Sequence, residues 1–159
     1  DVRVYNVPSS SNFYMSDFTL PTTDEQSDHW DVGIVASFGY MVPAAIINAF
    51  PLTMINVHGS LLPKYRGASP IQYSIANGES YTGVTILTVS PSIIDRGTII
   101  ARRSVPIQSD ETFVTLRDRL AVLGAELLTD VITRWNLYIE NSITYNELEA
   151  VEGTGLHKK

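Results

Sequence analysis

Short apolar runs separated by polar loops set the pattern of this chain. Residues 31–36 and 53–58 are compact apolar runs, which is the pattern of strands buried on both faces of a sheet. Residues 82–89 and 98–105 are rich in β-branched side chains and predict two further strands. By contrast, residues 6–30 are rich in Ser, Asn, Asp and Thr, which is typical of a loop with short ordered pieces.

Two short helices are expected after the first two strands. Residues 43–50 form one of them, because Pro43 suits a first helical turn and a proline follows the last residue. Residues 70–77 form the other, with Ser69 as the N-cap and Gly78 as the C-terminal stop.

A longer helix is expected from about residue 111 to residue 134, opened by Asp110. Its apolar positions recur at three and four residues and form one stripe, made of Phe113, Leu116, Leu120, Leu123, Leu127 and Val131. Residues 135–159 hold one short strand pattern and a polar end. This order of strands and helices predicts an α/β fold with a twisted, mostly parallel sheet flanked by helices.

Composition narrows the class of protein. The 159 residues are 44% hydrophobic and 18% charged, which is typical of one globular domain. No apolar run approaches the roughly 18 residues that span a bilayer, so we expect no membrane contact. The absence of cysteine excludes disulfides and cysteine nucleophiles, and the histidines at 29, 58 and 157 are too scattered to suggest a metal site. A formal charge of −6 argues against a large phosphate-binding surface on this chain alone.

Asn56 and His58 end the second predicted strand, which is where ligands bind in open α/β sheets. Residues two apart on a strand point to the same face, so an amide and an imidazole are directed at one point. Taken alone, the pair also fits a core histidine and an asparagine that satisfies backbone groups. The connection that follows, residues 59–69, is longer than the usual βα loop of about 2–6 residues, and this favours a functional site.

Residues 56–67 read Asn-Val-His-Gly-Ser-Leu-Leu-Pro-Lys-Tyr-Arg-Gly, which resembles the signature of the formyltransferases that use 10-formyltetrahydrofolate. The resemblance is close over about residues 31–107, and it implies a Rossmann-like core whose N-terminal part is missing here. It also implies that residues 1–145 form a partial catalytic core. Residues 146–159 would then be a linker towards an absent C-terminal domain.

The resemblance implies that Asn56, His58 and Asp95 are catalytic. When an amine attacks the formyl carbon on folate N10, an oxyanion forms, and Asn56 can donate a hydrogen bond to it. A protonated His58 can donate another and later move a proton, while Asp95 can favour the charged imidazole or hold a relaying water. Taken alone, the tripeptide at 95–97 is an ordinary turn. Its Arg96 stands where family members usually carry a small or neutral residue.

Two loops are implied to bind the folate. Their residues are Phe38, Gly39, Tyr40, Met41 and Val42 in one, and Ser90, Pro91, Ser92 and Ile93 in the other. For Phe38, a role as a core or loop anchor stays open. The acceptor substrate is expected to contact Ser60, Leu61, Leu62, Pro63, Lys64 and Arg66. For Lys64 and Arg66, a solvated loop is the alternative.

Residues 38–43 and 68–72 resemble the branch of the family that formylates methionyl-tRNA. We therefore expect formyl transfer from 10-formyltetrahydrofolate to initiator methionyl-tRNA for translation initiation, by a monomer, with the tRNA held mainly by regions outside this chain and with no metal. The alternatives are a small amine acceptor, such as a nucleotide sugar or glycinamide ribonucleotide, and a truncated relative without turnover. The sequence around Asp95 resembles mitochondrial members, which favours the mitochondrial matrix over a bacterial cytoplasm.

Overall fold

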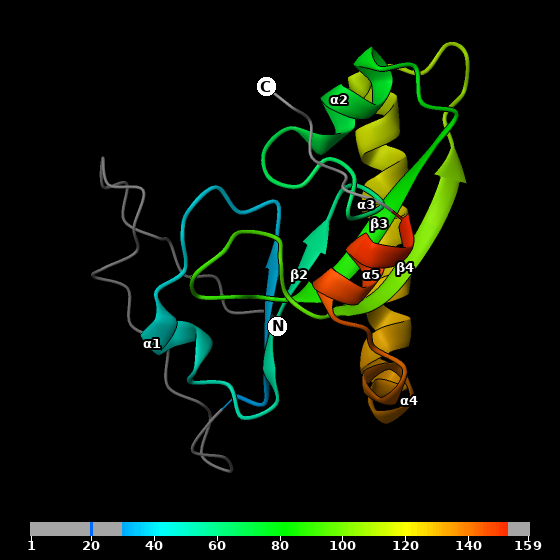
Figure 1. The fold of residues 1–159 in the computed structure, drawn as a ribbon. Coiled ribbons are helices and arrows are strands. Elements are labelled where there is room, and N and C mark those ends of the chain that lie inside the picture. Colours follow the sequence, from blue (N-terminus) through cyan, green and yellow to red (C-terminus); the bar gives the residue numbers. More distant parts are fainter. Residues whose placement is uncertain (1–19, 21–29, 153–159) are drawn as a thin grey trace.

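In the computed structural model, residue 20 and residues 30–152 are described. They contain a four-stranded sheet in the order β1-β2-β3-β4 (Figure 1). The strands are β1 (Val32–Ala36), β2 (Thr53–His58), β3 (Tyr81–Thr88) and β4 (Ile99–Pro106). All four strands predicted from the apolar runs are present, each within one residue at both ends.

The sheet is mixed over the described residues, so the expectation of mostly parallel pairing holds only for β1 and β2. β3 pairs antiparallel with both β2 and β4. The only helix between β2 and β3 is α2 (Pro70–Ala76), which at about 1.5 Å per residue spans roughly 10 Å. The chain therefore stays near the carboxyl end of β2, and β3 starts there and runs back. A loop without a helix joins β3 to β4, which gives an antiparallel pair.

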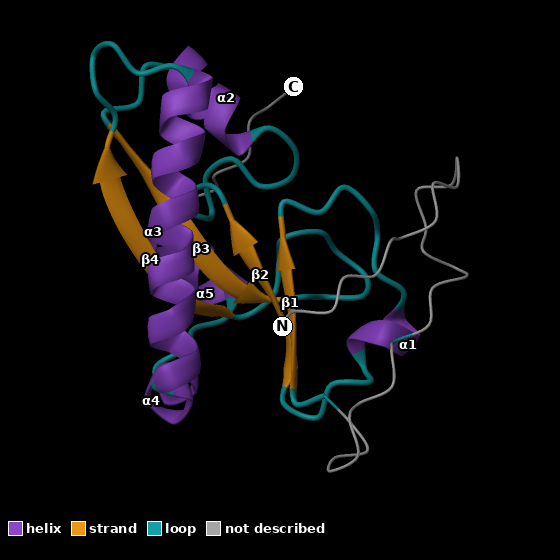
Figure 2. Cartoon of the chain, turned by 180° about the vertical axis from the view of Figure 1, so that it is seen from behind, coloured by secondary structure: helices purple, strands orange, loops and turns teal. Residues whose placement is uncertain are grey.

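Helices cover both faces of this α/β sheet. α3 (Phe113–Thr133) lies along β3 and β4 on one face, and α5 (Tyr145–Glu152) lies on the opposite face (Figures 1 and 2). The remaining helices are α1 (Ala44–Ile47), shorter than predicted, and α4 (Trp135–Glu140). None of the helices in the described ranges is both long enough and apolar enough to cross a membrane.

The structure corrects the predicted start of α3, while α2 starts at Pro70 after Ser69 as predicted. Thr112, not Asp110, caps α3: the Thr115 backbone N–H donates to Thr112 Oγ1 at 3.2 Å, and the Thr112 N–H donates to Thr115 Oγ1 at 3.0 Å. This reciprocal pair is a capping box. Ser69 has a left-handed backbone with φ 59°, and its side chain makes no capping hydrogen bond within the described part of the chain. Gly78, with φ 64°, ends α2 as predicted.

The main core lies between α3 and the sheet. It contains Ile55, Ile86, Ile100, Ala101, Leu127 and Val131, with Val84, Leu116 and Leu120 beside them. The predicted stripe of α3 is therefore buried along most of its length. It is wrong for Phe113, whose side chain is 39% exposed. Phe113 is the first residue of α3, and it lines a surface hollow instead of packing into the core.

The segment after α3 packs back onto the sheet. Ile143 forms an isolated antiparallel bridge with Ile99, where a short strand was predicted. In α5, Tyr145 and Leu148 are only 4% and 1% exposed. They share a buried cluster with Leu62, Leu87 and Ile99. The described core therefore continues through α5, past the boundary expected after residue 145.

Candidate active site

Asn56, His58 and Asp95 form one cluster. The loop between β3 and β4 crosses in front of β2 and β1 (Figure 1), which carries Asp95 over the face of β2 that Asn56 and His58 share. Asn56 Nδ2 donates to Asp95 Oδ1 at 3.0 Å, and His58 Nδ1 lies 3.4 Å from Asp95 Oδ2. The side chains of His58 and Asp95 are only 6% and 10% exposed. The fold thus brings together the three residues expected to be catalytic.

Two backbone groups complete this cluster. The Gly67 N–H donates to Asp95 Oδ2 at 3.1 Å, and the Tyr65 carbonyl accepts a hydrogen bond from His58 Nε2 at 3.0 Å. Both ring nitrogens of His58 therefore face oxygen atoms, and only the doubly protonated ring can donate at both. Asp95 itself has a left-handed backbone with φ 48°. Such a conformation persists in a residue other than glycine only where surrounding contacts hold it.

A first hollow lies between the loop after β1 and the loop after β3. It is lined by Val35, Phe38, Tyr40, Met41, Val42, Asn56, Leu87, Thr88, Val89, Ser90, Ile94 and Asp95. Five of the residues expected to bind folate are among them: Phe38, Tyr40, Met41, Val42 and Ser90. Pro91, Ser92 and Ile93 are exposed and are not among the residues that line it. Gly39 lines a second, adjoining hollow.

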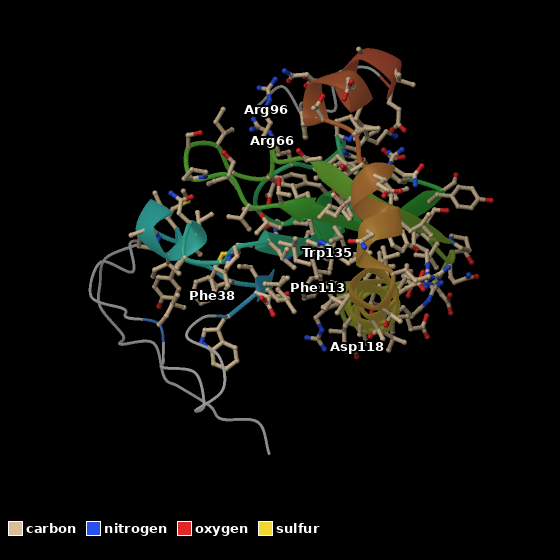
Figure 3. The ribbon with its side chains drawn as sticks, turned by 90° about the horizontal axis from the view of Figure 1, so that it is seen from below. Phe38, Arg66, Arg96, Phe113, Asp118 and Trp135 are labelled. Carbon is tan, nitrogen blue, oxygen red and sulfur yellow. The ribbon has the colours of Figure 1, made fainter. Side chains whose placement is uncertain are left out.

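Phe38 and Tyr40 form an aromatic wall of the first hollow. Their ring centroids are 5.4 Å apart with a tilt of 49°. The two side chains are 38% and 37% exposed, so Phe38 (labelled in Figure 3) is not a core residue. Ile94, at the end of the second expected folate loop, also lines this hollow, while sequence reasoning missed its strand-end residues. The apolar alternation into Leu87 and Val89 was a usable signal for the latter.

The second hollow shares six lining residues with the first, and Asn56 and Asp95 are among them. It extends over residues 67–72 to the first turns of α3, where it is lined by Phe113 and Arg117 (Figure 3 labels Phe113). The Arg117 guanidinium carbon lies 5.9 Å from the centre of the Phe113 ring. Neither residue was expected at the site, since the helical stripe predicted Phe113 to be in the core. Asn56 and Asp95 thus line both hollows.

Three residues expected to contact the acceptor are buried. Ser60 and Leu62 are 0% exposed, and Pro63 is also fully buried. Ser60 Oγ donates to the Lys64 carbonyl at 2.7 Å, inside the loop. Because these side chains are in the interior, they shape the loop that follows β2, and their expected contact with the acceptor stays a prediction.

The other three acceptor candidates are at the surface or half-buried. Lys64 Nζ pairs with Glu79 at 3.1 Å, and Lys64 lines a separate hollow together with Leu61. Arg66, labelled in Figure 3, reaches the other site loop, where its Nη1 donates to the Ile94 carbonyl at 3.3 Å. Of these candidates, only Arg66 contacts the loop that carries Asp95.

No group of three or more His, Asp or Glu side chains that could hold a metal ion occurs within the described residues. His29 and His157 lie outside those residues.

Sequence relatives of this chain include methionyl-tRNA formyltransferases. That of Lactobacillus gasseri is 40% identical over 114 residues, which are 72% of this chain and 35% of that protein. That of Synechococcus elongatus is 39% identical over 134 residues, which are 84% of this chain and 41% of that protein. The chain thus spans well under half the length of these curated relatives.

Solved structures that resemble this fold include formyltransferases named for other acceptors. A sugar N-formyltransferase from Shewanella sp. superimposes with a TM-score of 0.59 at 28% identity, over 73% of this chain and 45% of that chain. Glycinamide ribonucleotide transformylase 1 from Symbiobacterium toebii gives a TM-score of 0.55 at 30% identity, over 62% of this chain and 47% of that chain. The similarity confirms the expected formyltransferase core.

A family model described as formyl transferase matches residues 21–132. The match spans all four strands, α2 and nearly all of α3, and it contains Asn56, His58 and Asp95. With more than two thirds of its residues inside that match, the chain belongs to the formyl transferase family.

Proposed function

We propose that this chain is the catalytic part of an enzyme that transfers a formyl group from 10-formyltetrahydrofolate to the amino group of methionyl-tRNA. The observation that carries the proposal is the position of Asn56 and Asp95 where the two hollows meet. A group transfer needs such a point, because donor and acceptor must approach the same polar groups from different sides. The choice of acceptor is supported by the names of the sequence relatives.

The first hollow suits a folate donor. Its walls include the rings of Phe38 and Tyr40 and the side chain of Ile94, and aromatic and aliphatic walls of this kind accommodate a flat ring. Its polar end is formed by Asn56 and Asp95. We propose that the pteridine lies against the walls, so that the formyl group reaches the polar end.

The residues at that end can carry the transfer. As the amine bonds to the formyl carbon, the formyl oxygen becomes negative, and the Asn56 amide, which has two N–H groups, can donate one of them to it. The Asp95 carboxylate accepts the proton that the amine loses. That proton passes to folate N10 as the bond between N10 and the formyl carbon breaks. His58, with Nδ1 next to Asp95, stabilises the charge on that carboxylate.

This mechanism differs from the expectation that His58 is a second oxyanion donor. Both of its ring nitrogens face protein oxygens, from Asp95 and from the Tyr65 carbonyl. The proton-accepting group of the proposal is therefore Asp95, and His58 acts through it.

We propose that the aminoacyl end of the tRNA enters the second hollow, where Arg117 of the lining and Arg66, bonded to the Ile94 carbonyl, can meet its phosphates. The larger part of the tRNA contact would lie outside this chain. A monomer in the mitochondrial matrix, with a role in translation initiation, also stays a proposal. The compartment rests on the sequence at Ile94 to Arg96.

The test is the formylation of methionyl-tRNA by the complete protein with a labelled formyl donor. We expect Asn56→Ala, His58→Ala and Asp95→Ala each to lower turnover at least about tenfold, because one oxyanion donor or one general base contributes that much or more. Glu140→Ala, at an exposed position of α4, serves as the control. Near-normal turnover in all three site variants would contradict the proposed mechanism.

A small amine is the second candidate acceptor, favoured by the sugar and ribonucleotide enzymes among the structural relatives. The same assay with an amino sugar nucleotide and with glycinamide ribonucleotide separates the two proposals. Formylation of either small acceptor, without formylation of methionyl-tRNA, would overturn the tRNA proposal. Binding of the folate without turnover on any acceptor would favour a relative that has lost catalysis.

A further inference from the structure

Tyr65 connects the active-site cluster to a polar group outside it. Its backbone carbonyl accepts the hydrogen bond from His58 Nε2 at 3.0 Å. Its hydroxyl donates to Glu79 Oε1 at 2.7 Å and accepts from Asn77 Nδ2 at 3.1 Å. Glu79 and Asn77 lie between the end of α2 and the start of β3. Tyr65 thus links this turn to the imidazole of His58, through its hydroxyl on one side and its carbonyl on the other.

This connection depends on the backbone conformation of Tyr65. Its φ is 57°, in the left-handed region, which costs a residue with a Cβ roughly 1–2 kcal/mol. Such a conformation is kept only where the surroundings hold it. If φ relaxed to an ordinary negative value, the neighbouring peptide planes would turn, and the carbonyl would no longer face His58.

The side chain of Tyr65 supplies the holding contacts. It is 6% exposed, and its ring is nearly parallel to that of Tyr73, with centroids 6.5 Å apart. Glu79 is itself held by Lys64, whose Nζ lies 3.1 Å from both carboxylate oxygens. Burial raises the pKa of Tyr65, so the hydroxyl keeps its proton and remains a donor to Glu79.

We propose that Tyr65 is a positioning residue for His58. Its hydroxyl, anchored on Glu79 and Asn77, holds the left-handed backbone and keeps the carbonyl against His58 Nε2. The ring is thereby oriented so that Nδ1 stays beside Asp95. This inference rests on the proposed function, because it takes His58 to act in formyl transfer through Asp95.

The test removes one hydroxyl. Tyr65→Phe in the complete protein keeps the ring, and we expect kcat for formylation to fall about tenfold, since small misplacements of catalytic groups cost one to two orders of magnitude. KM for both substrates is expected to change less than about twofold, because no binding group is lost. The NMR signals of the His58 ring, identified by their loss in His58→Gln, are expected to shift.

A matched control and variants of Glu79, the partner of the Tyr65 hydroxyl, complete the test. Tyr81→Phe, at a tyrosine that is 63% exposed, is expected to leave kcat and the His58 signals unchanged. Glu79→Ala is expected to lower kcat as Tyr65→Phe does, and the double variant is expected to be no worse than either one, because the two groups act as a unit. Glu79→Gln keeps an oxygen acceptor for the hydroxyl and is expected to retain most of the activity.

Three results would overturn the proposal. The first is an unchanged kcat together with unchanged His58 signals in Tyr65→Phe. The second is a rise in KM at constant kcat, which would make Tyr65 a substrate contact. The third is additive losses in the double variant. If Tyr65→Phe does not fold, as judged by circular dichroism, Glu79→Ala carries the same readouts. Failure of the wild-type protein to formylate methionyl-tRNA would contradict the proposed function instead, and the His58 signals would still test the positioning.

Discussion

The two loops that form the site, residues 59–69 after β2 and residues 89–98 after β3, are held in different ways. The first is built into the interior. Thr85 Oγ1 donates to the Ser60 carbonyl at 2.7 Å and accepts from the Leu62 N–H at 3.0 Å, and all three residues are fully buried. A loop tied to the sheet by buried hydrogen bonds keeps a fixed path.

The second loop is held at a few separate points. Ile93 and Ile94 are 45% and 48% exposed. The loop is fastened where Gly97 packs against Thr88 and where the Ile94 carbonyl accepts from Arg66. Of these two, Ile94 lines the first hollow, where a ligand would cover it. The first loop is therefore held in place by buried hydrogen bonds. The second loop supplies the Asp95 carboxylate and part of the apolar wall of the first hollow.

The largest expected effect on stability comes from Thr85→Val, which removes the hydroxyl at constant shape. Two buried backbone groups then lose their partner, at about 1–3 kcal/mol each, so we expect a loss of about 2–6 kcal/mol in the free energy of unfolding. The same change at Thr88, whose Oγ1 accepts from the half-buried Thr98 N–H at 2.9 Å, should cost about 1 kcal/mol. Denaturant unfolding measures both. Equal losses of unfolding free energy in Thr85→Val and Thr88→Val would contradict the difference between the two loops.

The next largest effect is expected from Gly97→Ala. A Cβ at this position would lie 1.7 Å from the Thr88 carbonyl oxygen, so the backbone must shift. We expect a loss of about 1–3 kcal/mol and reduced turnover, because Asp95 is two residues away. Gly39→Ala is the control, since no described heavy atom lies within 4 Å of its added Cβ. It should stay within about 0.5 kcal/mol. Full activity of Gly97→Ala would mean that Asp95 does not depend on this fastening.

Ile94→Ser tests whether the second loop forms part of the donor site. Ile94 lines both hollows, and removing its apolar surface should weaken donor binding by about 1 kcal/mol, equivalent to roughly a fivefold rise in KM for the folate. Stability should hardly change, since the side chain is half exposed. Ile93→Ser removes a similarly exposed side chain that lines neither hollow. A similar rise in KM for both variants would rule out a specific contact with Ile94.

The smallest effect is expected from Arg96→Gln. Arg96 Nη2 donates to Asn146 Oδ1 at 3.0 Å and lies 3.4 Å from Glu149 Oε2, with the guanidinium over the Tyr145 ring. These exposed contacts should contribute about 0.5–1 kcal/mol, and salt should weaken them. Arg102 of β4 fastens the first loop, and Arg102→Gln loses the hydrogen bond to the buried Leu62 carbonyl together with the ion pair with Glu152, so it should cost more. Unfolding at low and high salt compares the two, and a larger loss at Arg96 would reverse the comparison.

Local sequence patterns predicted the helices and strands well, but they predicted helix caps and the burial of loop residues less well. The strands follow from β-branched and apolar runs, and the C-terminal end of α2 follows from Gly78, because these signals are contained in a few adjacent residues. The start of α3 was misplaced because Asp110 and Thr112 are both good caps, and only the backbone geometry selects Thr112. Ser60 was expected to contact the substrate because a polar residue in a site loop gives no sign that its side chain is buried and bonded to the Lys64 carbonyl.

The sequence by itself determined the family and the identity of Asn56, His58 and Asp95, because the signature and its order along the chain are properties of the residues alone. Only the tertiary structure decided how these groups meet. Asn56 and Asp95 are 39 residues apart along the chain, and their hydrogen bond depends on where the second loop crosses the sheet. The direction of β3, the central position of Asp95 and the contact of the Tyr65 carbonyl with His58 depend likewise on loop paths and on two left-handed residues. These features come from contacts between distant segments, which no local pattern of apolar and polar residues encodes.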